Sequence, residues 1–137
     1  MSLDDLKREV MEGWPDIPAA SLALGVIEFM GRLGDQELRM LTIPRLLEAV
    51  GRSRVDQEFL AALAILVSST VHVLDAKAFL YEEEGSEFHV DAQELATARQ
   101  LGSLEHPETG ELIADFEDRL IPYFQSSPRF LEARAHG

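Results

Sequence analysis

The sequence contains no cysteine in 137 residues, which excludes a disulfide framework and thiolate chemistry. It also lacks an apolar run of the roughly 18 residues that a membrane span needs. Its first residues are acidic and mixed in character, unlike a targeting segment. These absences favour a cytoplasmic protein. The length predicts one domain with terminal extensions, and a hydrophobic content of 46% is sufficient for a core.

Basic residues are scarce. The sequence has 12 lysines and arginines and 25 acidic residues, which gives a net charge of −13. Such a charge opposes binding to nucleic acid and favours basic partners. The distribution is uneven. Residues 31–54 hold five arginines and three acidic residues, whereas residues 75–118 hold thirteen acidic residues and two basic ones. We expect the acidic stretch to be mostly a solvated face.

Helix signals recur through the first half of the chain. Apolar residues at steps of three and four predict helices over residues 3–12 and 19–33. A third helix is expected over about residues 43–50, with Thr42 as its cap. The segment 35–41 fits a short helix or a short strand equally well.

The stretch GRSRVDQEF, which begins at Gly51, has the form of a turn between two helices. Gly51 ends the preceding helix, and Ser53 with Asp56 fits a capping box. We expect a helix of about 15 residues to follow, ending at Ser69 or Thr70.

Clustered β-branched and aromatic residues predict a strand over 71–81, and alternation predicts a second strand over 87–90. The two would pair as a hairpin around an acidic turn. In the expected register four side chains share one face, and these are Phe79, Tyr81, Phe88 and Val90.

Beyond the hairpin, Asp91 caps a predicted helix over 92–101, and a loop follows. Residues 111–125 have apolar side chains at steps of four, which suits a helix. Residues 126–137 are expected to form a loosely held end.

The order of these elements resembles the winged-helix version of the helix-turn-helix over about residues 19–90. TIPRLLEAVGRSRVDQEFLAALAILVSS resembles its second and third helices, and VHVLDAKAFLYEEEGSEFHV resembles its wing. The resemblance implies a mostly helical α+β fold with a winged-helix-like core at 19–90. The rest of the chain is then an N-terminal helix and linker at 1–18 and a C-terminal helical extension at 91–137. In that superfamily the third helix usually enters the DNA major groove.

The residues at these positions do not suit DNA reading. The predicted helix that follows Gly51 corresponds to the third helix of that fold. It is apolar nearly all round beyond Phe59, and the wing tip is acidic. We therefore predict a non-catalytic protein–protein interaction module, an accessory or dimeric subunit of a cytoplasmic complex. A second interpretation makes the apolar helix simply the core of a small monomer. The predicted partner-binding residues are Arg54, Gln57, Ala61, Ala64, Glu82, Glu83 and Glu84.

The alternative function is a winged-helix DNA-binding regulator that contacts phosphates through Arg45, Arg52 and Arg54. No set of residues indicates catalysis. The four histidines are not paired in sequence with a convincing nucleophile, and the glycines form no phosphate-binding loop. We therefore predict no enzyme activity, no cofactor, no metal and no small-molecule ligand.

Overall fold

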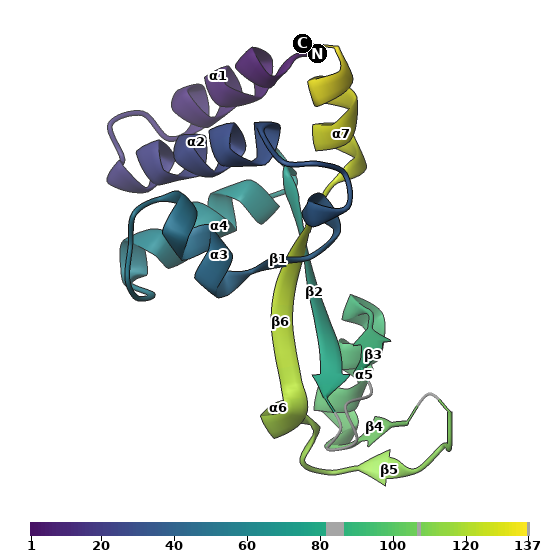
Figure 1. Ribbon diagram of the computed structural model, residues 1–137. Helices are drawn as coiled ribbons and strands as arrows, with labels where there is room; N and C mark the ends of the chain where they lie inside the picture. The colour runs from purple at the N-terminus through teal and green to yellow at the C-terminus, as the bar shows by residue number, and fades with distance from the viewer. Residues whose placement is uncertain (82–86, 107, 137) are drawn as a thin grey trace. The chain divides into compact units, whose positions relative to one another are not determined.

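The computed structural model describes residues 1–81, 87–106 and 108–136 of an α+β protein that is mostly helical (Figure 1). The chain forms two compact units. Unit 1 comprises Met1–Asp75 and Phe124–Gly137, and unit 2 comprises Ala76–Tyr123. These units group the chain differently from the segments 1–18, 19–90 and 91–137, because the chain returns to unit 1 at its end.

Unit 1 is built from helices joined by short connections. Its elements are α1 (Leu3–Gly13), α2 (Pro18–Gly31), the 3₁₀ turn η1 (Glu37–Arg39), β1 (Leu41–Thr42), α3 (Ile43–Ala49), α4 (Gln57–Val67) and α7 (Pro128–Ala135). The helices expected over 3–12, 19–33 and 43–50 are confirmed. The ambiguous segment 35–41 contains both the 3₁₀ turn and the first residue of β1. Among the described residues, no helix is both long enough and apolar enough to cross a bilayer.

Helix α4 begins three residues later than the predicted capping box requires. Its cap is Asp56, whose Oδ1 accepts a hydrogen bond from the Phe59 amide at 2.8 Å. The expectation that Ser53 caps this helix was wrong, because Asp56 itself satisfies one of the amides left free at the helix start. Arg54 consequently lies in the loop before α4 and not on the helix.

The core of unit 1 lies between α2 and α4, which pack along each other, with α1 and α7 against the remaining sides. Burial of these apolar side chains contributes about 1.5–3 kcal/mol for each large one. The largest fully buried side chains in this core are Phe59, Phe130, Leu6, Ile27, Met30, Leu38, Leu41, Leu46, Leu66 and Leu74.

The end of the chain is an ordered helix, so the expectation of a loosely held end was wrong. Phe130 of α7 is fully buried, and so is Ser127, which caps the helix. The Ser127 hydroxyl donates to the His72 carbonyl at 2.6 Å and accepts from the Phe130 amide at 3.0 Å. Arg129 donates to both oxygens of Glu9 in α1, at 2.7 and 2.8 Å.

Unit 2 combines a hairpin with the helix α5, the four-residue helix α6 and several short strands. Its elements are β2 (Leu74–Tyr81), β3 (Glu87–Val90), α5 (Ala92–Leu101), β4 (Leu104–Glu105), β5 (Leu112–Ile113), α6 (Phe116–Arg119) and β6 (Leu120–Ser126). Strands β1, β6, β2 and β3 follow one another in one sheet, and β4 pairs with β5 in another. The boundaries between the units fall within β2 and β6.

Two expectations about unit 2 are confirmed and two are wrong, one of which is the hairpin register. Strands β2 and β3 pair as predicted, and Asp91 caps α5 as predicted. Gly102, left-handed at φ +83°, ends the helix. Of the helix expected over 111–125, only the four residues of α6 are helical. Residues 120–126 are instead extended, because they pair as a strand of the four-stranded sheet.

The hairpin register also differs from the expected one. Leu80 lies opposite Phe88, and Phe79 lies opposite His89. Since side chains alternate between faces, a one-residue difference exchanges the faces of every side chain on the strand. Leu80, Phe88 and Val90 therefore join the core of unit 2, while Phe79 shares the other face with His89.

We predict that replacing Phe130 by alanine destabilises the protein by about 3–5 kcal/mol, because it leaves a cavity in a core that repacks only partly. Replacing the adjacent Leu131, which is 38% exposed, by alanine should cost less than about 1 kcal/mol. Urea unfolding followed by circular dichroism measures both. Equal small losses would show that α7 does not stabilise unit 1.

Candidate functional site

The first candidate site is the exposed face of α4. Gln57, Leu60, Ala61 and Ala64 are exposed and recur at steps of three and four, so they form one stripe along the helix. Leu60 is 54% exposed. The opposite face is buried against the core and consists of Phe59, Ala62, Leu63, Ile65 and Leu66. The stripe is thus an uncharged, mostly apolar surface on a helix that is otherwise core.

The structure brings three of the predicted partner-binding residues together and separates the others from them. Gln57, Ala61 and Ala64 share the α4 stripe, whereas Arg54 is exposed in the loop before the helix, next to Val55. Glu82, Glu83 and Glu84 lie outside the described residues. Sequence reasoning missed Leu60 because a leucine in an apolar run was assigned to the core. Its three-residue step from Gln57 and four-residue step to Ala64 are the signal that could have found it.

Two of the three arginines proposed for DNA contact are paired with carboxylates inside unit 1. Arg52 donates to Asp56 at 2.6 Å and to Glu58 at 3.0 Å. Arg45 donates to Glu37 at 3.3 Å, and its guanidinium lies 5.6 Å from the centre of the Phe29 ring. Each pairing would have to be given up or shared for a phosphate contact.

The loop before α4 is also an electrostatic support for the helix. The pKa of Asp56 is lowered first by the hydrogen bond from the Phe59 amide, and then by the charges of Arg52 and Arg54. The carboxylate that caps α4 is therefore held in its charged form. Arg52 of the predicted turn thus pairs with the carboxylate that caps α4, and Gly51 in the same turn has φ +69°.

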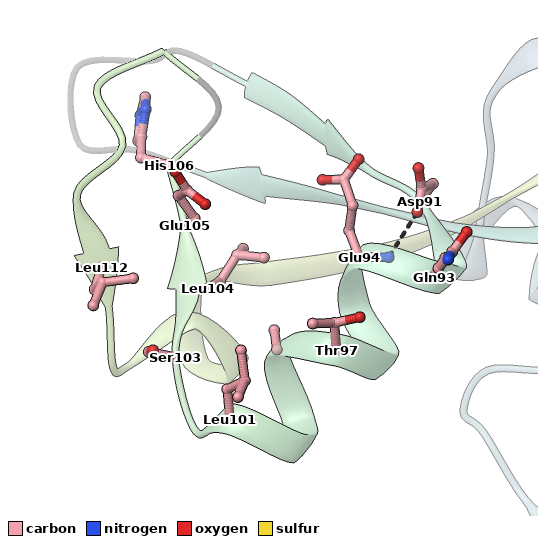
Figure 2. Close-up of a pocket in the computed structure, with 11 residues that line it drawn as sticks. Asp91, Gln93, Glu94, Thr97, Leu101, Ser103, Leu104, Glu105, His106 and Leu112 are labelled. Atoms are coloured by element: carbon pink, nitrogen blue, oxygen red, sulfur yellow. Dashed lines mark hydrogen bonds between the residues drawn. The ribbon is translucent and has the colours of Figure 1, made fainter.

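The second candidate site is a cavity of about 580 Å³ in unit 2, between α5 and the β4–β5 pair (Figure 2). Figure 2 shows Asp91 and Glu94 at the start of α5 on one side of the cavity and Glu105 and His106 on the other, with the His106 ring pointing away from α5. Below them lie apolar side chains from both elements. The described lining residues are Asp91, Gln93, Glu94, Thr97, Ala98, Leu101, Ser103, Leu104, Glu105, His106 and Leu112.

The pKa values of the Asp91 and Glu94 carboxyl groups are shifted in opposite directions. Asp91 Oδ1 accepts from the Glu94 amide at 2.7 Å, and this bond is the main cause of its lowered pKa. The pKa of Glu94 is raised, first by desolvation and then by the hydrogen bond to and the charge of Asp91. Asp91 is therefore the stronger acid of this pair of neighbouring carboxyls.

His106 closes one end of the cavity and organises its turn. Only 7% of the residue is exposed. Its Nδ1 accepts from the amides of Glu108 and Thr109 at 3.1 and 3.3 Å, and its ring meets Phe88 edge-on at 4.6 Å. Because Nδ1 is an acceptor here, the ring proton lies on Nε2. The sequence indicated this turn but gave no sign of the cavity, which depends on the unpredicted pairing of β4 with β5.

The other face of the hairpin holds a compact polar contact. The Tyr123 hydroxyl lies 2.7 Å from His89 Nδ1, and the Tyr123 ring lies 5.8 Å from that of Phe79. Burial raises the pKa of Tyr123. In the described ranges, no three histidine and carboxylate side chains come together in a way that could hold a metal ion. The contact between Tyr123 and His89 links β6 to the hairpin within unit 2.

We predict that Asp91→Asn lowers the pKa of Glu94 toward its ordinary value, because it removes the negative charge that opposes ionisation of Glu94. Asparagine also caps helices well, so α5 should remain intact. Carbon-13 NMR titration of the Glu94 carboxyl measures the shift, and Asp118→Asn is the control of equal charge change. An unaltered Glu94 titration in Asp91→Asn would show that desolvation alone causes the shift.

Comparison with known proteins gives no relative for this chain: no family model, no curated protein and no solved structure matches it. Two surfaces of the described residues are therefore the candidates for a functional contact. One is the uncharged stripe on α4, and the other is the acidic cavity of unit 2.

Proposed function

We propose that the protein is a non-catalytic interaction module that self-associates through the exposed stripe of α4. The observation that carries the proposal is the 54% exposure of Leu60 beside Ala61 and Ala64, on a stripe with no charged side chain. Covering such an exposed leucine stabilises the complex with the partner, because apolar surface is removed from water. The protein would act as a dimeric or accessory subunit of a larger complex.

The chemistry of the stripe suits a second copy of the same helix. Small side chains at Ala61 and Ala64 allow two helix axes to approach closely, and no charge has to be desolvated at the contact. A twofold axis would place the Leu60 side chains of both copies in one interface, since such a contact uses the same patch twice. The charge of the chain does not oppose this contact locally, because the carboxylates nearest the stripe, Asp56 and Glu58, are paired with Arg52.

The winged-helix interpretation is part of this proposal. The order α2, β1, α3, α4 and then the β2–β3 hairpin supports it, and α4 then stands in the position of the third helix. The helix that reads DNA in many such domains would serve here as a protein contact. The pairing of Arg45 and Arg52 with carboxylates favours protein association over the DNA-binding alternative.

Sedimentation velocity of the pure chain tests self-association. We predict a concentration-dependent dimer for the natural sequence, and a dimer dissociation constant raised by at least about tenfold in Leu60→Glu. The matched control is Leu101→Glu in unit 2, because Leu101 is 75% exposed and the chemical change is the same. Leu101→Glu should associate as the natural chain does.

Two results would contradict the proposal. One is a natural chain that stays monomeric at submillimolar concentration, in which case the stripe is simply the solvated side of a small monomer. The other is tight, low-salt binding to duplex DNA that Arg54→Ala weakens, as measured by fluorescence anisotropy. That result would support the regulator alternative, because Arg54 is the exposed arginine of the three.

A further inference from the structure

We propose that the cavity of unit 2 binds a basic peptide segment of a partner protein. In this complex one arginine or lysine side chain lies between the carboxylates of α5 and β4, and neighbouring apolar side chains of the peptide cover Leu101 and Leu112. This contact is separate from the stripe on α4 and involves different residues.

The arrangement of charge around the cavity favours a cationic group. Asp91 and Glu94 stand on one side and Glu105 on the other (Figure 2). No described residue that lines the cavity is a lysine or an arginine. The arginines of unit 2 are engaged elsewhere, since Arg99 pairs with Glu117 at 2.6 Å and Arg119 with Asp115 at 3.3 Å. The third basic residue of the unit, Lys77, does not line the cavity, although its charge helps to lower the pKa of Asp91.

The apolar part of the cavity indicates that the occupant is more than a bare cation. Leu101 and Leu112 are 75% and 69% exposed, which makes them the most exposed of the large apolar side chains described. Ala98 and Leu104, which also line the cavity, are buried among the core of unit 2. Exposed leucines beside carboxylates form a surface that is covered best by a ligand with both apolar and basic groups.

Size and long-range charge point to the same class of ligand. A volume of about 580 Å³ lies in the range of binding cavities and accommodates more than one side chain. Residues 76–123 contain twelve acidic residues and three basic ones. Such a field attracts basic segments and raises their association rate, while short-range contacts in the cavity determine which segment is retained.

Fluorescence anisotropy with short labelled peptides tests the proposal. The probe is Gly-Leu-Arg-Leu-Gly, and the controls are Gly-Leu-Gln-Leu-Gly, which lacks the charge, and Gly-Ser-Arg-Ser-Gly, which lacks the apolar side chains. We expect the probe to bind more tightly than both controls. Unlabelled spermidine should compete poorly, because it leaves Leu101 and Leu112 uncovered.

Variants of the protein locate the binding. Glu94→Gln and Glu105→Gln should each weaken the probe by about two- to fivefold, as expected for partly exposed ion pairs. Leu112→Ser should weaken binding of the probe but not binding of the Gly-Ser-Arg-Ser-Gly control. Asp118→Asn makes the same change of charge outside the cavity and should leave binding within about twofold of the natural chain, apart from the general field.

The proposal is overturned if the probe does not bind, if Asp118→Asn weakens it as much as Glu94→Gln, or if spermidine displaces it as readily as the unlabelled probe does. The last two results would mean attraction by net charge alone. Amide shifts in NMR spectra provide a second measurement, because binding in the cavity must perturb residues 91–106 more than those of α4. Leu60→Glu should leave peptide binding unchanged, so failure of this proposal and failure of self-association are distinguishable.

Discussion

The buried hydrogen bonds of Ser127 are the constraint on which unit 1 depends. The hydroxyl donates to the His72 carbonyl, and the Ser127 amide donates to the Val73 carbonyl at 2.9 Å. His72 has φ +42°, which is uncommon for a residue with a side chain, and its amide is bonded to the Ser68 carbonyl at 2.7 Å. These bonds fix the point where the chain leaves the helices and the point where it returns. Without them, Phe130 would not reach the core built by α1, α2 and α4, and Arg129 would not reach Glu9 of α1.

Local signals in the sequence predicted local structure well. Thr42 and Asp91 each mark a helix start that the structure has, because a cap depends on residues within one turn. The helix predicted over 111–125 was wrong outside α6 for the opposite reason. Its apolar steps of four fit a helix, but its backbone pairs with strands far away in sequence, and no local pattern records that pairing.

The candidate sites were predictable to different degrees. The α4 stripe could be outlined from spacing, but Leu60 could not be assigned to it until the helix start and its buried face were known. The pairing of Arg52 with Asp56 lies within four residues and was open to inference, whereas that of Arg45 with Glu37 depends on the 3₁₀ turn. The cavity was not predictable, since it requires β4, β5 and α5 to meet. The positions of acidic residues in the sequence do not indicate whether they surround a cavity lined by apolar side chains.

The two proposed contacts differ in the force that drives them, and the division of charge along the chain makes both possible. The α4 stripe is uncharged and lies in the unit with fewer excess carboxylates, so covering it relies on apolar burial and is insensitive to screening. The cavity lies in the unit that holds twelve of the 25 acidic residues within 48 positions, so its ligand is attracted by charge and responds to salt. A chain whose acids were spread evenly would weaken both contacts. Like charge would approach the stripe, and the field around the cavity would be diluted.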